Sequence, residues 1–271
     1  MTIKSSGSSL SFSEIEAEFG ANGSRSLGSY RLTQSVGSLS NLPLDTGIPT
    51  SGQIKFSDFY GKQLNVVVDC HSGGEETRII AKNSKWNNNN LTVIGGFRSK
   101  KEGGSKIIIN VNKKICSDKN NVNHCALRTG SWDGTATVQI DVGSSGKILG
   151  SGGDGGSGAQ GINNSGSPGS SGTSGLGIDT NNVTVNIASG GIIRAGFGGG
   201  GGGGNNANQA YGASGGSGAN LGGNAGGGGS SQTGGGGAGG NGAAIRRVSG
   251  FTVNINNSGS ITGSTSATGV S

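Results

Sequence analysis

The sequence predicts a mainly β protein with little α-helix, in which a bundle of polyglycine-II (polyproline-II-type) helices replaces much of an ordinary core. Three observations support this prediction. Of the 61 glycines, 45 lie in residues 143–271, and seven of them are consecutive at 198–204. Short segments with an apolar residue at every second position recur between the glycine-rich stretches. The chain is only 30% hydrophobic and 4% aromatic, which is too little for one large core.

The strand-like segments follow one pattern in three copies. Each copy opens with apolar residues at period two, which is typical of a half-buried strand, and closes on a glycine turn. The copies begin at residues 138, 183 and 251, so their spacing is unequal; this predicts variable loops on a shared scaffold, not a solenoid of constant period. In register the copies are Val138-x-Ile140-x-Val142-x-x-x-Gly146-x-Ile148, Val183-x-Val185-x-Ile187-x-x-x-Gly191-x-Ile193 and Phe251-x-Val253-x-Ile255-x-x-x-Gly259-x-Ile261.

The glycine runs allow two interpretations. Gly/Ser-rich sequence is by default a flexible linker, because each glycine loses much backbone entropy on folding and buries no side chain. Alternatively, the runs are packed polyproline-II-type helices, whose outward N–H and C=O groups bond neighbouring helices where no Cβ intervenes. We favour packing, because isoleucine and leucine residues punctuate this region and few charges solvate it. The runs expected to form individual helices are residues 198–204, 226–229 and 234–237.

Composition argues against several classes of protein. The net charge is +6, but the basic residues form neither a patch with interleaved aromatics nor an Arg-Gly-Gly series, so no nucleic-acid binding is expected. No stretch approaches the roughly 18 apolar residues of a membrane span, so no membrane insertion is expected. Residues 1–6 lack the apolar core of a secretory leader. We therefore expect assembly in the cytoplasm without translocation.

Residues 1–62 are predicted to be a separate module. A short helix is expected near residues 12–19, with Ser11 or Ser13 as its N-cap and acids in its first turn. Aromatic residues are more concentrated here than so short a segment can bury by itself. The module is either folded onto the next domain or completes its burial against a partner, and we favour docking. The candidate docking residues are Phe12, Phe19, Ile48, Phe56, Phe59 and Tyr60.

Two parts of the chain resemble bacteriophage virion proteins. The segment Phe12-Ser-Glu-Ile-x-x-Glu-Phe19, followed by Gly47-Ile-Pro-Thr-Ser-Gly52 and Ile54-x-Phe56-Ser-Asp-Phe59-Tyr-Gly61, resembles an N-terminal module of tail-associated proteins. Residues 143–271, with strands, Ser-Gly-x-Ile turns and long glycine runs, resemble the glycine-rich receptor-recognising adhesins at the tips of long tail fibres in T-even-like phages.

The resemblance implies a function. In the adhesin family, packed polyglycine helices display variable loops that contact bacterial surface proteins or glycans. It implies here a virion protein of the tail or fibre, which attaches to other tail proteins through residues 1–62 and binds a host surface receptor, with no cofactor. A trimeric fibre is one assembly that fits. The alternative is a structural tail or fibre protein without receptor contact.

Receptor contact needs side chains, so we expect it in the segments that interrupt the glycine runs. Residues 205–211 follow the longest run; their amides suit hydrogen bonding, and Tyr211 offers rigid contact area. The alternative is that these segments are solvated turns. The candidate receptor-binding residues are Asn205, Asn206, Asn208, Gln209, Tyr211, Asn220, Leu221 and Gln232.

Residues 63–142 are expected to form a small antiparallel β-domain. Short runs rich in β-branched residues alternate there with Gly- and Asn-rich turns. Trp86 and Trp132 are core residues in the favoured interpretation and exposed sugar-stacking rings in the alternative.

Five residues of this region are of types that bind zinc, namely Cys70, His71, Cys116, His124 and Cys125. Their spacing fits no common zinc motif, and adjacent residues on a strand face opposite sides. We therefore expect free, packed cysteines in preference to a metal site or a Cys116–Cys125 disulfide.

Catalysis has little support in the sequence. Asp133 and Asp141 are the carboxylates considered for glycoside hydrolysis, but such a pair needs a cleft between them that the sequence does not indicate. The glycine-rich loops lack the strand, helix and Lys-Ser/Thr of a phosphate-binding loop. We therefore expect no enzymatic activity.

Overall fold

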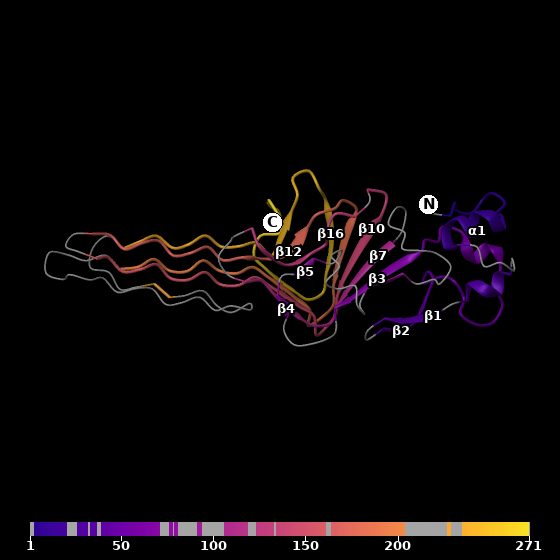
Figure 1. The fold of residues 1–271 in the computed structure, drawn as a ribbon, viewed down its shortest axis with the longest axis horizontal. Helices are drawn as coiled ribbons and strands as arrows, with labels where there is room; N and C mark the ends of the chain where they lie inside the picture. The colour runs from indigo at the N-terminus through magenta and orange to yellow at the C-terminus, as the bar shows by residue number, and fades with distance from the viewer. Residues whose placement is uncertain are drawn as a thin grey trace.

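The computed structural model of the chain describes residues 3–20, 26–31, 33–36, 39–70, 76–77, 79–80, 91–93, 106–118, 123–132, 134–160, 164–203, 227–228 and 235–270. The fold is mainly β, with little α-helix, as the sequence predicts. Its centre is a stack of parallel strands, flanked by the N-terminal module on one side and by extended glycine-rich segments on the other (Figure 1).

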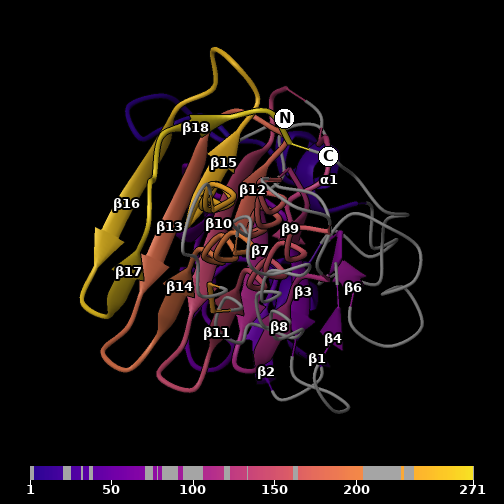
Figure 2. The same ribbon diagram turned by 90° about the vertical axis from the view of Figure 1, so that its left-hand side faces the viewer.

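The stack is a three-sided β-solenoid of five coils, and each coil contributes one strand to each of three parallel sheets. Figure 2 shows the coils following one another from β3 to β16. The first sheet contains β3 (Asn65–Cys70), β7 (Lys106–Val111), β10 (Thr137–Val142), β13 (Val183–Ile187) and β16 (Val253–Asn257). The second contains β4 (Glu76–Thr77), β8 (Lys114–Cys116), β11 (Lys147–Leu149), β14 (Ile192–Arg194) and β17 (Ser260–Thr262). The third contains β5 (Ile79–Ile80), β9 (Cys125–Arg128), β12 (Ser174–Ile178), β15 (Ile245–Arg247) and β18 (Ala267–Thr268).

Every second side chain along each strand of the first sheet contributes to the core. Successive side chains of a strand point to opposite faces, so every second residue points into the solenoid and stacks on its counterpart in the next coil. One such row consists of Val68, Ile109, Ile140, Val185 and Ile255. The first four are buried and the last is partly buried at the end of the stack. β-Branched residues dominate this row because they pack well on a pleated surface.

An ion pair ties the third sheet to the corner that follows it. The guanidinium of Arg128 donates to both carboxylate oxygens of Asp179, at 3.0 and 2.7 Å. The same carboxylate accepts the backbone N–H of Gly130. The hydrogen bonds to Asp179 raise the pKa of Arg128 above its usual value.

The N-terminal module packs on the outer face of the first sheet. It contains α1 (Phe12–Phe19), η1 (Leu27–Tyr30), β1 (Thr33–Val36), β2 (Leu39–Pro43) and η2 (Phe56–Phe59), and β1 and β2 pair antiparallel. Helix α1 begins with a capping box, in which the Ser11 hydroxyl accepts the N–H of Glu14 and the Glu14 carboxylate accepts the N–H of Ser11. The cap is therefore Ser11, one of the two residues predicted.

The core of the module is aromatic and is shared with the solenoid. Phe19, Tyr30 and Phe59 are fully buried, with ring centroids 5.7 to 6.2 Å apart. Val67 of β3 and Ile108 of β7 pack against the same cluster. Tyr30 donates to the carbonyl of Gly20 at 2.9 Å, and burial raises its pKa to about 12.

This arrangement corrects the prediction that these aromatic residues need a partner protein for burial. Phe19, Ile48 and Phe59 are at most 3% exposed within the chain itself. The solenoid supplies the surface that the module lacks, which is the alternative that we disfavoured. Of the six candidate docking residues, only Phe12, Phe56 and Tyr60 retain partly exposed side chains.

The predicted antiparallel β-domain at residues 63–142 is also wrong. Strand β7 pairs parallel with both β3 and β10, whereas β6 (Leu91–Val93) joins β3 antiparallel. The boundary after residue 142 has no structural counterpart, because β10 pairs with β13 as well as with β7. Both predicted domains belong to one solenoid. Trp132 lies in its core at 5% exposure and donates to the carbonyl of Thr129, which confirms the favoured interpretation of that ring.

The three predicted repeats do stack, but the third copy is displaced by two residues. Val138 pairs with Val183, its equivalent in the aligned repeat, whereas Val183 pairs with Val253 and not with Phe251. The predicted register returns after the turn, where Ile193 pairs with Ile261. The turn of the last coil is shorter, and a shift of two residues keeps the same face of a strand inward.

Replacing Phe59 with Ala tests the shared core. We expect the variant to lose about 3–5 kcal/mol of unfolding free energy, because a large, fully buried ring leaves a cavity. Phe12→Ala is the control, since Phe12 is partly exposed and its ring pairs with that of Phe56 at 4.9 Å between centroids; its loss should be about 1 kcal/mol. Urea unfolding measures both, and equal losses would contradict the described packing.

Candidate functional site

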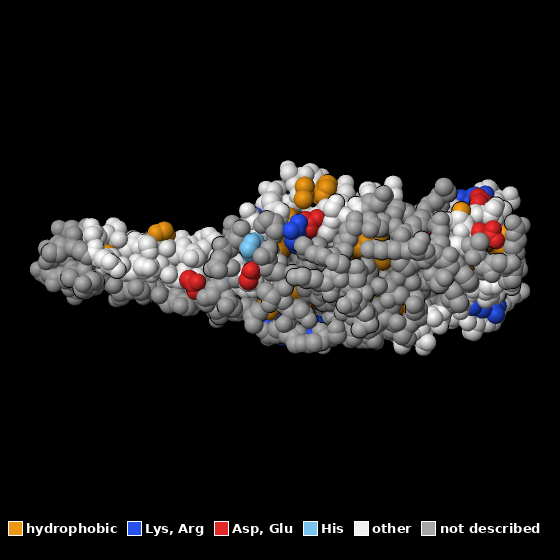
Figure 3. Space-filling view, viewed as in Figure 1, with side chains coloured by type: hydrophobic (Ala, Val, Ile, Leu, Met, Phe, Trp, Pro, Cys, Tyr) orange, Lys and Arg blue, Asp and Glu red, His pale blue; other side chains and the backbone are white. Residues whose placement is uncertain are grey.

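Two long insertions leave the solenoid at the same corner. Residues 150–173 join β11 to β12, and residues 195–244 join β14 to β15, so both arise between the second and third sheets. Their described parts run side by side away from the solenoid, on the side opposite to the N-terminal module (Figure 1). The surface of these parts is mostly backbone and uncharged polar side chains (Figure 3). We call them together the stalk.

Four described segments of the stalk are numbered one to four here, at residues 150–159, 166–173, 195–203 and 235–242; residues 227–228 are a further described part of it. Backbone hydrogen bonds join them at intervals of three residues. Segment one donates to segment three from Gly153, Gly156 and Ala159 to Phe197, Gly200 and Gly203. Segment three donates to segment two from Gly196, Gly199 and Gly202 to Thr173, Ser170 and Ser167. Segment four donates to segment three from Gly236, Gly239 and Gly242 to Gly202, Gly199 and Gly196.

Segment two also donates to segments one and four, for example from Ser170 to Asp154 and from Gly169 to Gly237, so segments two and three each have direct bonds to the other three segments. Segment three runs parallel to segment one, because the bonded residue numbers rise together, and antiparallel to segments two and four. Hydroxyl groups satisfy further backbone donors: Oγ1 of Thr173 accepts the N–H of Ser151, and Oγ of Ser167 accepts the N–H of Ser157, both at 2.7 Å. Polar backbone is therefore paired although the segments are neither α-helix nor β-strand.

Close approach of the backbones requires glycine in segment three. A Cβ on Gly201 would lie 1.7 Å from the carbonyl oxygen of Gly236, and a Cβ on Gly199 would lie 2.0 Å from that of Asp154. On a further side, a Cβ on Gly200 would lie 2.3 Å from the nitrogen of Gly228. All three distances are shorter than any side chain tolerates. The run of glycines is therefore explained by contacts on three sides.

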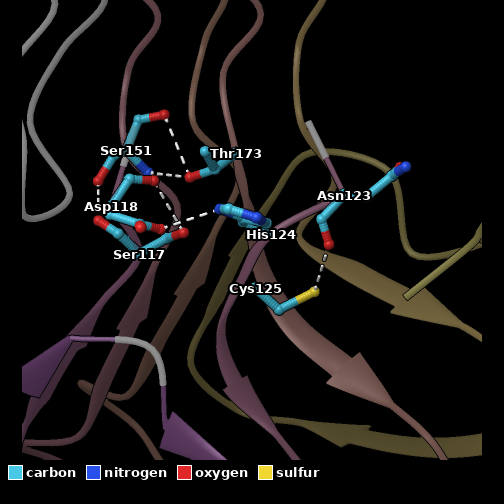
Figure 4. Close-up of polar contacts among 7 residues, drawn as sticks. All are labelled: Ser117, Asp118, Asn123, His124, Cys125, Ser151 and Thr173. Carbon is cyan, nitrogen blue, oxygen red and sulfur yellow. Dashed lines mark hydrogen bonds and ion pairs between the residues drawn. The ribbon is translucent and has the colours of Figure 1, made fainter. Parts of the chain in front are cut away.

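Hydrogen bonds that involve Ser117, Ser151 and Thr173 hold the base of the stalk (Figure 4). Ser117, which follows β8, donates its N–H to Leu149 and accepts a hydrogen bond at its carbonyl from the hydroxyl of Ser151. Ser151 in turn bonds Thr173 through its backbone. Both ends of the first insertion are thus held at the corner where it leaves the solenoid.

The histidine beside this base pairs with a carboxylate. Nδ1 of His124 lies 3.1 Å from Oδ1 of Asp118, while the thiol of the adjacent Cys125 turns the other way and donates to the carbonyl of Asn123 (Figure 4). Adjacent side chains therefore diverge, as expected. Cys70, Cys116 and Cys125 are buried thiols that take part in no disulfide, so the Cys116–Cys125 disulfide does not form. No group of three or more His, Cys, Asp or Glu that suits a metal occurs in the described ranges, and His71 lies outside them.

The candidate receptor-binding residues lie outside the described residues. This holds for Asn205, Asn206, Asn208, Gln209, Tyr211, Asn220, Leu221 and Gln232, and also for Trp86 and Asp133. For residues 205–211 the structure gives the attachment point, since they follow segment three. The hydrogen-bonded pairs progress from Gly150 with Arg194 at the base to Ala159 with Gly203, so Gly203 lies at the end of the described segment that is farther from the solenoid.

Sequence reasoning missed the first two stalk segments, because neither contains a long glycine run. A weaker signal is present in both. Segment two has glycine at every third position, 166, 169 and 172, and segment one has side chains larger than Ala only at every third position, 151, 154 and 157. A three-residue period is the spacing of the hydrogen bonds, so it would have identified these segments.

Asp141, considered above as a catalytic carboxylate, lies on β10 and accepts hydrogen bonds from Gln139 and Asn186.

Replacing Gly201 with Ala tests the packing of the stalk. We expect the variant to lose about 1–3 kcal/mol of unfolding free energy, because the new methyl group would force segments three and four apart. Gly237→Ala is the matched control, since nothing lies within 4 Å of a Cβ there, and its effect should stay within about 0.5 kcal/mol. Hydrogen exchange of the amides of residues 196–203 measures the local loss. Equal protection in the two variants would contradict the described contacts.

None of the helices in the described part of the chain has the length and hydropathy of a membrane span. No family model, no curated protein and no solved structure matches this chain.

Proposed function

We propose that this chain is a receptor-binding adhesin of a bacteriophage tail or tail fibre, in which the N-terminal module joins the virion and the stalk presents loops to the host surface. The observation that carries the proposal is the stalk itself. A set of backbone-bonded segments that extends from one corner of a solenoid adds little to the core, but it holds the chain far from the body. That geometry suits a protein that reaches a surface.

In this proposal the stalk is a bundle of polyglycine-II helices. Such a helix has three residues per turn and no internal hydrogen bonds, so its backbone groups bond neighbouring helices at intervals of three residues. The three-residue spacing between segments one, two, three and four supports this assignment, and so does the exclusion of a Cβ at Gly199 and Gly201. With a rise of about 3.1 Å per residue, residues 150–159 would span about 30 Å.

A bundle of this kind suits display of variable sequence. Its stability comes from backbone hydrogen bonds and close packing, so it places few demands on side chains beyond the glycines. Segments that connect the helices are then free to vary for recognition, as loops on a rigid scaffold commonly do. Residues 205–211 fit this role because they follow segment three and contain amides and a tyrosine.

Exchange of residues 205–211 for a Gly/Ser stretch of equal length tests the adhesin function. Phage that carry the exchange should assemble normally, because the solenoid and the described stalk are unchanged, and their adsorption rate should fall at least about tenfold. The measurement is residual free phage against time, with electron microscopy of particles as the assembly control. Adsorption at the wild-type rate would remove this segment from the receptor site and would favour a purely structural virion protein.

Virion attachment is assigned to the exposed side of the N-terminal module. Phe12 and Phe56 form an edge-to-face pair with centroids 4.9 Å apart, and both side chains are only partly buried. Apolar rings at the surface of an otherwise filled module suit a docking contact.

The double variant Phe12→Ala/Phe56→Ala should fold but fail to join the particle. Particles assembled with it should lack this protein on denaturing gels, while circular dichroism shows retained β structure in the purified chain. The fully buried Phe59 is unsuited to this test because its removal opens the core. Normal incorporation of the double variant would show that attachment uses another surface.

A further inference from the structure

The outer face of the first sheet changes character along the stack. One row of outward residues consists of Val67, Ile108, Gln139, Thr184 and Asn254, from β3 to β16. The first two pack against the N-terminal module. The last three line an open hollow of about 480 Å³ instead. The module therefore covers the first two coils, and the remaining three coils present polar side chains. We call their outward surface the amide face.

Hydrogen bonds between strands hold the amide face in one arrangement. Gln139 donates from Nε2 to the two carboxylate oxygens of Asp141, at 2.9 and 2.8 Å. Asn186 donates from Nδ2 to Oδ1 of Asp141 at 2.7 Å, and Asn256 donates from Nδ2 to Oδ1 of Asn186 at 2.8 Å. The side chains of β10, β13 and β16 are thus oriented before any ligand arrives, which lowers the entropy cost of binding.

The hydrogen-bonded row of Asp141, Asn186 and Asn256, called the ladder here, borders two hollows. Asn186 and Asn256 line the hollow of about 480 Å³ and also a second one of about 310 Å³, which Asp141 and Ser258 border. A primary amide has two N–H donors and an acceptor oxygen. Asn186 and Asn256 each engage a neighbouring side chain with one N–H, so each keeps a second N–H for a ligand. The two hollows therefore adjoin at Asn186 and Asn256, and we call them together the groove.

The chemistry of the groove selects among ligand classes. None of its lining residues is aromatic or arginine, the side chains that anchor most protein partners. Lys106 is the single basic residue among them, which is too little positive charge for a nucleic-acid backbone. Amides, hydroxyls and a carboxylate are complementary to hydroxyl groups, which both donate and accept. The groups repeat at the strand spacing of about 4.8 Å, similar to the length of one sugar ring.

We propose that the amide face binds an extended glycan chain, which lies across β10, β13 and β16 and bonds Thr184, Asn186, Asn254 and Asn256 through its hydroxyl groups. This site is separate from the stalk. The stalk leaves from the corner between the second and third sheets, so the first sheet is the opposite side of the solenoid (Figure 1). The proposal goes beyond host binding through loops and does not depend on it.

The test uses the full chain and protein-free polysaccharide, prepared from bacterial envelopes by protease digestion, together with an array of defined capsule and O-antigen oligosaccharides. Biolayer interferometry should detect binding of the wild-type chain to at least one glycan. Asn254→Ala, which leaves the hydrogen-bonded ladder intact, and the double variant Asn186→Ala/Asn256→Ala should each weaken it at least about tenfold. Thr262→Ala, on β17 of the second sheet, is the matched control and should bind as the wild type does.

Three results would overturn the proposal. The first is that the wild-type chain binds no glycan. The second is that Asn254→Ala and the double variant bind as well as Thr262→Ala. The third is that binding disappears when residues 205–211 are exchanged for Gly/Ser, which would place glycan recognition on the stalk. Loss of adsorption in that exchange, with glycan binding retained, would support both sites independently.

Discussion

Parallel backbone hydrogen bonding between successive coils is the constraint on which this structure depends. It fixes the distance from each strand to the next and forces equivalent residues to stack. Each inward position must therefore suit its own neighbours above and below, which is why Val, Ile and Leu fill the inner rows from β7 to β13. Residues at the corners do not have to stack on equivalent residues, provided that the chain returns to the same register. Insertions are therefore tolerated between the second and third sheets, and the stalk is formed by two such insertions.

The stalk is held together without a core of side chains. In the solenoid, each coil is stabilised both by apolar packing inside and by backbone hydrogen bonds to the neighbouring coils. In the stalk, backbone bonds remain but the core is absent, so the segments must approach until carbonyl and amide groups fill the space between them. A single methyl group at Gly201 exceeds that space. The two parts thus obey opposite demands on sequence, and this accounts for the abrupt change in composition where segments one and three begin.

Much of the fold was predictable, and the errors have physical causes. The repeat at Val138, Val183 and Phe251 identified three equivalent strand segments, although not their stacking as parallel coils. The third segment was misplaced by two residues because a strand shifted by two presents the same face. The antiparallel domain was a wrong prediction because short β-branched runs between glycine turns occur equally at the corners of a parallel solenoid. Burial of Phe19 and Phe59 was misjudged because nothing in residues 1–62 reveals that Val67 and Ile108 complete their core. Of the amide face, the sequence shows only separate Asn and Gln residues; their alignment follows from register. The receptor residues at 205–211 stay a prediction.

The hydrogen bonds of the stalk recur every third residue, and this has a consequence for how such proteins change their reach. Adding or removing one residue in a segment would rotate all later groups away from their partners. A change of three residues, made in two bonded segments together, restores every pairing. Lineages that carry this architecture are therefore expected to differ in stalk length by discrete steps, matched between adjacent segments, while the solenoid beneath stays the same.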